Sequence, residues 1–307
     1  MKLQMLNKTP RQSPGQVIVI LGPTASGKSE LAVKMALRLG SGQAEIISAD
    51  SRQVYRGLNI GSGKITKKEM RGVPHHCLDI ASPKKVFTAV DFKKCAEKAI
   101  KDIQSRGKTP IICGGTGFYI SAITGGIDIP EVKPNWKLRK KLEKMPVEKL
   151  FKMLKKLNPE RAKNIDKHNP RRLIRAIEIT KNPPSVPPYK GGKITPSHDK
   201  GKVGKGFTFL GIKLPEKELK KRIEKRVKKM LKDGLLDEIK KLRKSGLPWK
   251  RFYELGFEYK YPAMFLQGKI GSKEMLEKMI IENRQYAKRQ MTWFKKYAPK
   301  TKWVKKG

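Results

Sequence analysis

A single octapeptide at residues 22–29 constrains the fold of this chain more than any other feature. Its sequence, GPTASGKS, fits the pattern G-x-x-x-x-G-K-[ST] of loops that bind phosphate groups. The aliphatic run at 17–21 predicts a buried parallel strand before it, and apolar residues at helical spacing over 31–39 predict a helix after it. Strand, loop and helix is the context in which this motif binds a phosphate chain; a Gly-rich turn without a ligand is the alternative.

The residue types of this loop suit an anion. Glycines let the backbone curve around a phosphate, and the exposed amides at a helix N-terminus point towards it. Lys28 adds a positive charge, and the hydroxyl of Ser29 is a ligand for Mg²⁺, which is therefore the cofactor we expect. The predicted phosphate-binding residues are Gly22, Pro23, Thr24, Ala25, Ser26, Gly27, Lys28 and Ser29.

Strand and helix patterns alternate further along the chain. Residues 44–49 and 110–113 predict strands, and residues 89–105 predict a helix for which Thr88 and Asp91 form a capping box. Such alternation implies a parallel sheet with helices on its faces. We therefore predict an α/β fold of the P-loop NTPase-like type, in which helices cover a parallel sheet.

The pattern changes at residue 125, where apolar residues keep helical spacing with no strand between them. Residues 181–206 are rich in Pro, Gly and Lys, which is typical of a mobile linker. A strand at 207–214 and helices near 219–231 and 273–297 then resume the core. The predicted domains are a core of residues 1–124 and 207–307, and a small all-helical insertion with its basic linker at 125–206.

Two segments place polar side chains where predicted strands end. Asp50 follows the second strand, at the edge where open α/β sheets bind their ligands, so it is a candidate base or metal partner. A cap for the next helix is the alternative. Residues 114–117, GGTG, follow the strand at 110–113 in the same way and add the hydroxyl of Thr116. Taken alone, this string is equally typical of a plain strand-to-helix turn.

Charge indicates a polyanionic partner. The chain has 71 Lys and Arg residues against 27 Asp and Glu residues, and its formal net charge is +44. Cations that neutralise phosphates gain affinity by releasing counterions, so nucleic acid and an anionic membrane both fit. A lysine bias shared by a whole proteome is the alternative, and charge alone does not choose between them.

Several classes of protein are disfavoured. No stretch approaches the roughly 20 apolar residues of a membrane span, and residues 1–14 lack the apolar run of a secretory signal, so we expect a cytoplasmic protein. Cys77, Cys95 and Cys113 form no C-x-x-C pair and support neither a disulfide framework nor a zinc finger. Residues 74–77, PHHC, are interpreted as a structural turn rather than a metal site.

Six motifs are far more specific in combination than any one of them is alone. In order over residues 17–297, they are GPTASGKS at 22–29, ADSRQVY at 49–55, PHH at 74–76, GGTGFY at 114–119, NPRRLIRAIE at 169–178 and RQYAKRQMTW at 284–293. Their combination resembles the tRNA dimethylallyltransferases, also called tRNA isopentenyltransferases, in their bacterial form. The chain departs mildly from the family pattern, with GSGK at 61–64 in place of GTAK and LGF at 255–257 in place of IGY.

The resemblance implies transfer of a dimethylallyl group from dimethylallyl diphosphate to the exocyclic amine of adenosine 37, in the anticodon stem-loop of tRNA, with release of diphosphate. It implies that the loop at 22–29 binds the prenyl diphosphate, with Mg²⁺ at Ser29, and that Asp50, Lys28 and Thr116 are catalytic. The helical insertion would contact the tRNA, and we expect a monomer. The implied tRNA-binding residues are Asp50, Ser51, Arg52, Gln53, Thr116, Arg139, Arg171, Arg172, Leu173, Ile174 and Arg175.

Two other classes of function remain open. In a P-loop kinase or a nucleic-acid-dependent NTPase, Asp50 would hold Mg²⁺, and phosphoryl transfer would replace prenyl transfer. An RNA-binding scaffold with a relic phosphate loop is the non-enzymatic alternative. The intact Lys28, Ser29 and Asp50 disfavour the scaffold.

The basic, aromatic C-terminal segment has two interpretations. Tyr286, Trp293 and Tyr297 share helical spacing, so we predict that they pack against the core rather than stack on bases. The lysines from residue 295 onwards extend a positive tail, for which we predict nonspecific contact with RNA. A solvated run of charge is the alternative for that tail.

Overall fold

The chain forms two compact units. The computed structural model describes residues 15–127, 129–130, 132–183 and 206–305. One unit consists of residues 1–126 with 201–307, and the other of residues 127–200. The predicted linker at 181–206 lies, apart from its ends, outside the described residues.

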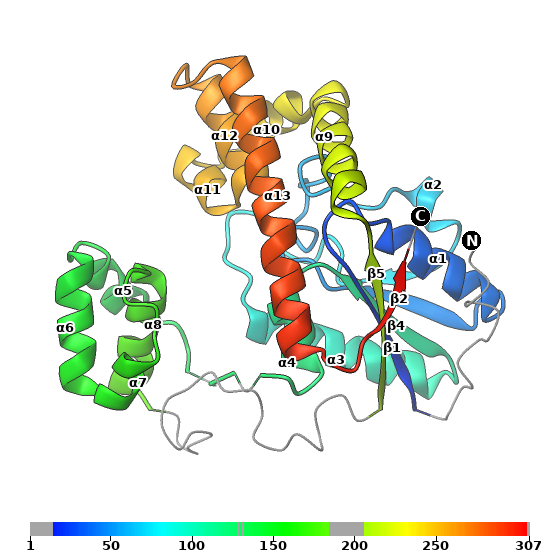
Figure 1. The fold of residues 1–307 in the computed structure, drawn as a ribbon, viewed down its shortest axis with the longest axis horizontal. Coiled ribbons are helices and arrows are strands. Elements are labelled where there is room, and N and C mark those ends of the chain that lie inside the picture. Colours follow the sequence, from blue (N-terminus) through cyan, green and yellow to red (C-terminus); the bar gives the residue numbers. More distant parts are fainter. Residues whose placement is uncertain (1–14, 128, 131, 184–205, 306–307) are drawn as a thin grey trace. The chain divides into compact units, whose positions relative to one another are not determined.

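Within the described residues, six strands form one parallel sheet in the first unit (Figure 1). The strands are β1 (Val17–Leu21), β2 (Ala44–Ser48), β3 (His75–His76), β4 (Thr109–Gly114), β5 (Phe207–Lys213) and β6 (Lys302–Lys305). Their order across the sheet is β3-β2-β4-β1-β5-β6, and each pair of neighbours is parallel. The prediction of a parallel α/β sheet is confirmed.

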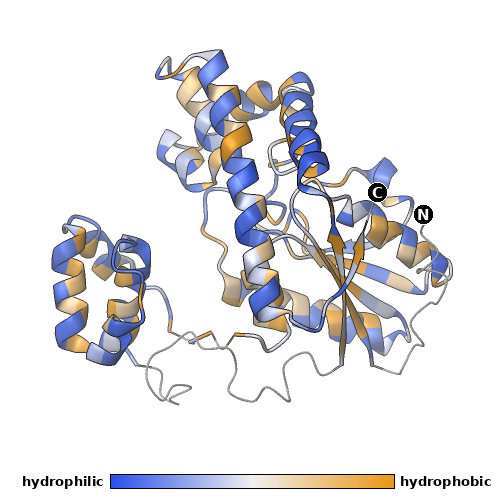
Figure 2. Cartoon of the chain, in the orientation of Figure 1, coloured by the Kyte–Doolittle hydropathy of each residue, from blue (hydrophilic) through white to orange (hydrophobic). Residues whose placement is uncertain are grey.

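The side chains of β1 enter two apolar cores in turn. Val17, Val19 and Leu21 belong to the larger core, whereas Ile18 and Ile20 belong to the smaller one. Successive side chains of a strand point to opposite faces, so a sheet that is covered on both faces needs apolar residues at every position. This explains the unbroken aliphatic run, and Figure 2 shows apolar strands at the centre of the unit.

The helices of the first unit are α1 (Lys28–Arg38), α2 (Lys67–Met70), α3 (Ala89–Ser105), α4 (Gly117–Ile123), α9 (Glu216–Lys232), α10 (Leu235–Lys244), α11 (Trp249–Glu254), α12 (Phe257–Leu266) and α13 (Ser272–Tyr297). They lie on the two faces of the sheet or, like α10, α11 and α12, beyond it (Figure 1). The small core contains buried residues of α1, and the large core contains Phe92 and Ala96 of α3. The predicted capping box of α3 is confirmed, because Thr88 and Asp91 each accept a hydrogen bond from the other's amide.

The two edge strands of the sheet differ from the prediction. The residues of β3 pair with Ile46 and Ile47, so the predicted turn at 74–77 is in part a strand. β6 pairs with β5, so the backbone of residues 302–305 belongs to the sheet and is not only a solvated tail. Its Trp303 lies over Gly211, where a Cβ atom would come within 2.4 Å of the indole ring. Strands this short show no periodicity that a sequence pattern could detect.

The three cysteines are free thiols. Cys77, which follows β3, and Cys95, in α3, bring their sulfur atoms to 2.8 Å from each other, although they are distant in sequence. No group of three His, Cys, Asp or Glu side chains in the described part of the chain is placed to hold a metal ion. None of the helices among the described residues is both long enough and apolar enough to cross a membrane.

The second unit is a small helical bundle. Its helices are α5 (Trp136–Leu142), α6 (Val147–Leu157), α7 (Pro159–Lys163) and α8 (Pro170–Lys181). Leu150, Leu154 and Leu173 are fully buried at its centre. The carboxylate of Glu178 is also buried, and Arg139 and Arg175 both pair with it. The unit therefore has its own apolar core and its own internal ion pairs.

A buried carboxylate in β2 joins three segments of the first unit. Glu45 accepts hydrogen bonds from both terminal nitrogens of Arg106, from Lys108 at 2.9 Å and from His76 at 2.7 Å. These partners, led by Arg106, hold the pKa of Glu45 far below its ordinary value near 4.5 although burial acts in the opposite direction. The ion pairs fasten the amino-terminal end of β4 and the edge strand β3 to β2.

We expect Glu45→Gln to lower the free energy of unfolding by about 3 kcal/mol, because removing one partner leaves the other charges uncompensated. The folded-state pKa is depressed, so this contribution is present above about pH 4.5 and is lost as the pH falls further. Urea unfolding between pH 3 and pH 7 measures both effects. Glu97→Gln, which removes an exposed pair with Lys93, is the control and should change stability by less than about 0.5 kcal/mol. Equal effects of the two substitutions would contradict the assignment.

Candidate active site

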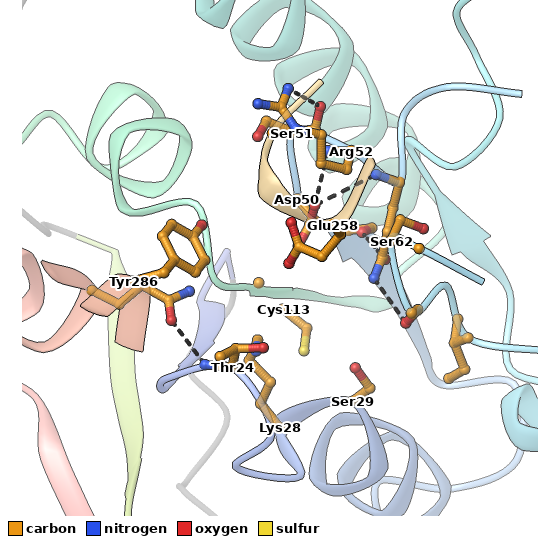
Figure 3. A pocket seen from close by; sticks show the side chains of 18 of the residues that line it. Thr24, Lys28, Ser29, Asp50, Ser51, Arg52, Ser62, Cys113, Glu258 and Tyr286 are labelled. Atoms are coloured by element: carbon orange, nitrogen blue, oxygen red, sulfur yellow. Dashed lines mark hydrogen bonds between the residues drawn. The ribbon is translucent and has the colours of Figure 1, made fainter. Parts of the chain in front are cut away.

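A cavity of about 370 Å³ opens at the carboxyl edge of the sheet (Figure 3). The segments that follow β1 and β2 and the end of β4 line it, because the carboxyl ends of parallel strands lie at one edge. Helices α9, α12 and α13 also contribute to the lining. Its ionisable and hydroxyl side chains include Lys28, Ser29, Asp50, Arg226, Glu258 and Tyr286.

The loop at 22–29 has the backbone of an anion-binding site. Gly27 has a φ of 84° and begins α1 without a side-chain cap, so the amides of the first helical turn have no partner inside the helix. At Gly22, a Cβ atom would lie 2.8 Å from the hydroxyl oxygen of Ser26. That hydroxyl is buried and, among the described residues, has no hydrogen-bond partner. Open amides and a spare hydroxyl suit a phosphate oxygen.

The amine of Lys28 lies inside the cavity. It donates to the carbonyl of Pro23 over 3.3 Å. Burial lowers its pKa, and nearby Arg226 acts in the same direction, while Cys113 and Asp50 oppose the shift. A bound anion would stabilise the charged form of this amine, so the electrostatics of the cavity favour a ligand with negative charge.

Asp50 is held by the turn that it begins. One carboxylate oxygen, Oδ1, accepts hydrogen bonds from the amides of Arg52 at 2.9 Å and Gln53 at 3.4 Å. The amide of Ser51 donates to the hydroxyl of Thr116 at 3.0 Å, which joins the segment after β2 to the segment after β4. Asp50 thus caps a local turn rather than a helix, and it also lines the cavity. The predicted alternative, a cap for the next helix, is therefore corrected to a cap for this turn.

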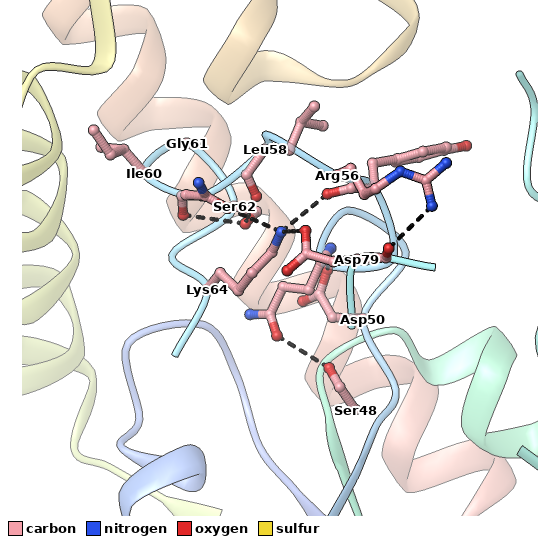
Figure 4. Close-up of polar contacts among 12 residues, drawn as sticks. Ser48, Asp50, Arg56, Leu58, Ile60, Gly61, Ser62, Lys64 and Asp79 are labelled. Atoms are coloured by element: carbon pink, nitrogen blue, oxygen red, sulfur yellow. Dashed lines mark hydrogen bonds and ion pairs between the residues drawn. The ribbon is translucent and has the colours of Figure 1, made fainter. Parts of the chain in front are cut away.

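Lys64 braces the segment that carries Asp50 (Figure 4). Its amine donates to the carbonyl of Tyr55 at 2.9 Å and to the side chain of Asn59 at 3.0 Å, and it pairs with Asp79. Only 6% of the Lys64 side chain is exposed. This lysine of the GSGK motif therefore supports the site from behind and does not line the cavity.

Gln290 in α13 connects the two glycine-rich loops. Its side-chain oxygen accepts a hydrogen bond from the amide of Thr24 at 2.8 Å, and its side-chain nitrogen donates to the carbonyl of Gly115 at 2.7 Å. The motif RQYAKRQMTW contains this residue, but its spacing gave no reason to single it out. A glutamine on a helix face can be assigned this role only when the fold is known.

Arg226 of α9 is a second cation of the cavity that sequence patterns did not identify. Its guanidinium donates to the carbonyl of Ser62 at 3.3 Å, and its buried Nε has no partner among the described residues. At Gly63 a Cβ atom would lie 2.3 Å from this guanidinium. The glycine that departs from the family's GTAK pattern therefore makes room for Arg226.

The aromatic residues of α13 have different roles. Trp293 donates to the hydroxyl of Ser121 at 3.0 Å and packs on Gly117, and its ring lies 4.4 Å from that of Tyr297. These two residues pack as predicted. Tyr286, by contrast, lines the cavity beside Thr116, so the prediction of core packing is wrong for this side chain.

The residues predicted to bind tRNA from the insertion belong to the second unit. Leu173 and Ile174 are buried in its core, and for their side chains the prediction is corrected, because a buried aliphatic side chain offers no surface to RNA. Arg139 and Arg175 are partly exposed, but both pair with Glu178. Arg171 and Arg172 are exposed and remain the predicted contacts.

The cavity also meets the requirements of Mg²⁺ bound together with a phosphate chain. This ion takes only one or two protein oxygens and completes its shell with phosphate oxygens and water. Ser29 lines the cavity at the start of α1 and is adjacent to Cys113. The hydroxyl of Ser29 is therefore a sufficient protein contribution to such an ion.

Comparisons with known proteins agree with this geometry. The sequence of residues 53–297 matches the family described as IPP transferase. The tRNA dimethylallyltransferase of Acetivibrio thermocellus is 39% identical over 287 residues, which cover 91% of this chain and 88% of that protein. A tRNA dimethylallyltransferase of Syntrophus aciditrophicus is 38% identical over 283 residues, 91% of this chain and 89% of that one.

Solved structures give the same result. The full-length tRNA isopentenylpyrophosphate transferase of Bacillus halodurans superposes with a TM-score of 0.67 at 34% identity, covering 95% of this chain and 90% of that one. A eukaryotic dimethylallyltransferase acting on tRNA superposes with a TM-score of 0.75 at 27% identity, covering 94% and 73% of the two chains. From the matched motifs, the shared fold and these identities, the chain belongs to the IPP transferase family.

Proposed function

We propose that this protein transfers a dimethylallyl group from dimethylallyl diphosphate to the exocyclic amine of adenosine 37 in tRNA and releases diphosphate. One observation carries the proposal: the phosphate-binding loop and the carboxylate of Asp50 line the same cavity. Figure 3 shows Lys28 and Ser29 at one end of it and Asp50 at the other. A phosphate chain and a nucleophile can therefore meet between these groups.

The acceptor side of the reaction needs a base. An exocyclic amine of adenine is a poor nucleophile, and it loses a proton as its nitrogen bonds to the first carbon of the prenyl group. The Oδ1 atom of Asp50 is occupied by two amides, so Oδ2 is the oxygen left to accept that proton. Thr116, bonded to the amide of Ser51, fixes the turn in which this carboxylate lies.

The donor side needs cations. As the bond between carbon and the diphosphate oxygen breaks, its electron pair leaves with the diphosphate, whose charge grows. Lys28, the open amides of α1 and Arg226 surround the place where such an anion would bind. Mg²⁺, held by Ser29, would supply further positive charge to the leaving diphosphate. Lys28 and Arg226 would thus stabilise the negative charge that grows on the diphosphate, while Asp50 accepts the proton that the amine loses.

The tRNA has to deliver a base that is normally stacked. Extruding a base costs a few kcal/mol, and contacts with the phosphate backbone can offset that cost. The net charge of +44 provides such contacts, and Arg171 and Arg172 are exposed members of it in the helical unit. We propose the anticodon stem-loop as the bound region and a monomer as the active form.

One labelling experiment separates the candidate functions. The protein is incubated with tRNA and Mg²⁺ and either labelled dimethylallyl diphosphate or γ-labelled ATP. Label that enters tRNA from the prenyl donor supports the proposal. Label that enters only from ATP, or ATP hydrolysis alone, would instead support the kinase or NTPase. If the protein binds tRNA but catalyses neither reaction, the result would support the RNA-binding scaffold.

We expect Asp50→Asn to lower kcat by about 10²–10⁴-fold, because an amide cannot accept the amine proton. The affinity for tRNA should change little, since the substitution keeps the shape of the side chain. Single-turnover kinetics and filter binding measure the two quantities. The control is Asp237→Asn, at an exposed position of α10. A variant at position 50 with unchanged kcat would exclude Asp50 as the base.

For tRNA binding, we expect the double substitution Arg171→Ala and Arg172→Ala to weaken affinity and to reduce the slope of log affinity against log salt by about 2, one for each lost phosphate contact. Both side chains are exposed, so folding should be unaffected. The matched control removes Lys152 and Lys155, two exposed charges of α6 in the same unit. If both double variants reduce the slope equally, the contact is a general effect of charge and not a property of these arginines.

A further inference from the structure

Glu258 is a carboxyl group of the cavity to which the proposed reaction assigns no role. It is the second residue of α12, and it lines the cavity together with Asp50. Gly256, just before the helix, has a φ of 109°, in the left-handed region that favours glycine. A Cβ atom there would lie 3.6 Å from Nε of Arg52 and 3.8 Å from Oε2 of Glu258.

The carboxyl of Glu258 is not committed to a structural partner. In the described part of the chain it forms no ion pair, and its own backbone amide donates to it. This differs from Glu45 and Glu178, the two buried carboxylates that each bind at least two cationic side chains. A half-buried carboxyl group at a cavity wall that is left without an ionic partner is typical of a ligand contact.

Charged groups from several elements face this carboxyl. Arg226 comes from α9, and Arg52 and Asp50 come from the segment after β2. Burial raises the pKa of Glu258 to about 7, and the charge of Asp50 adds to the shift, whereas Arg226 and Arg52 oppose it. The other titratable groups of the cavity are Lys28, His75, Cys113, Tyr286 and Arg289. Near neutral pH, Glu258 therefore carries a proton in a large fraction of molecules and is then a hydrogen-bond donor.

A carboxylate and a protonated carboxyl together match one pattern of a purine. In adenine the exocyclic amine is a donor, and a ring nitrogen that accepts hydrogen bonds lies beside it. Asp50 supplies the acceptor, and neutral Glu258 supplies the donor. Guanine presents the opposite pattern on its Watson–Crick edge, with an acceptor at O6 and a donor at N1, so each of the two carboxyl groups would face a like partner.

We propose that Glu258 is a specificity-determining residue that donates a hydrogen bond to a ring nitrogen of the target adenine, next to the amine whose proton Asp50 accepts. This inference rests on the proposed function. It assigns different roles to two carboxyl groups in one cavity: Asp50 is oriented by two backbone amides and takes part in bond formation, while Glu258 reads the base.

The test compares wild type with Glu258→Gln and Glu258→Met, using an anticodon stem-loop RNA as acceptor. The quantity is kcat/KM for the RNA between pH 6 and pH 9, which reports the ionisation of the free enzyme. Wild type should lose activity above about pH 7, close to tenfold per pH unit, because the neutral form is the active one. Glu258→Gln, a permanent donor, should stay within about threefold of wild type at pH 6.5 and lose the alkaline decline.

The methionine variant has a similar shape but no donor, and it should fall by about tenfold or more at pH 6.5, the value of one lost hydrogen bond to a buried partner. Thermal unfolding of each variant separates this loss from misfolding. A flat wild-type profile, a decline that persists in Glu258→Gln, or equal activity of the two variants would overturn the role of Glu258 while prenyl transfer itself is retained. Absence of prenyl transfer by wild type would instead overturn the proposed function and this inference with it.

Discussion

The side-chain amide of Gln290 is the contact on which the shape of the site depends. It bonds to the loop after β1 at Thr24 and to the loop after β4 at Gly115, so one helix fixes the distance between two strand ends. Both bonds are buried, and losing one would leave a backbone group without a partner, which is costly. Helix α13 also supplies Tyr286 to the cavity. The position of this one helix therefore determines how the phosphate-binding loop, the segment after β4 and the ring of Tyr286 lie relative to one another.

Around the cavity, glycines leave space for large neighbouring side chains. Gly63 leaves room for the guanidinium of Arg226, and Gly117 leaves room for the indole of Trp293; in each case a Cβ atom would come within 2.3 Å of the neighbouring ring or group. Lys64 then ties the chain beyond Gly63 to Tyr55 and Asp79. The GSGK motif thus makes room for the guanidinium of Arg226 and positions Lys64, while Gly61 and Gly63 themselves line the cavity.

The sheet and its phosphate loop could be predicted because local patterns encode them: an aliphatic strand, a glycine-rich turn and an amphipathic helix occur within residues 17–39. Asp50 and Thr116 were found by the same reasoning, since they follow strands directly. Arg226, Glu258 and Gln290 could not be found in this way, because each lies on a helix far along the chain and reaches the cavity only through tertiary packing. Leu173 and Ile174 show the converse error, in which a motif was assigned to binding although its apolar members build a core.

The acidic residues in the described part of the chain fall into groups that the net charge does not reveal: some pair with cations inside the fold, and others line the cavity without an ion pair. Glu45 and Glu178 are acids that neutralise arginines and lysines inside the fold, so Arg106, Arg139 and Arg175 are not simply part of a surface excess. Asp50 and Glu258 are acids without an ion pair among the described residues, and both lie in the cavity. With only 27 acidic residues against 71 basic ones, an acid that is left unpaired in a cavity is unexpected on electrostatic grounds alone. The two carboxyl groups of the cavity therefore remain available to a ligand, which is what the proposed function requires of them.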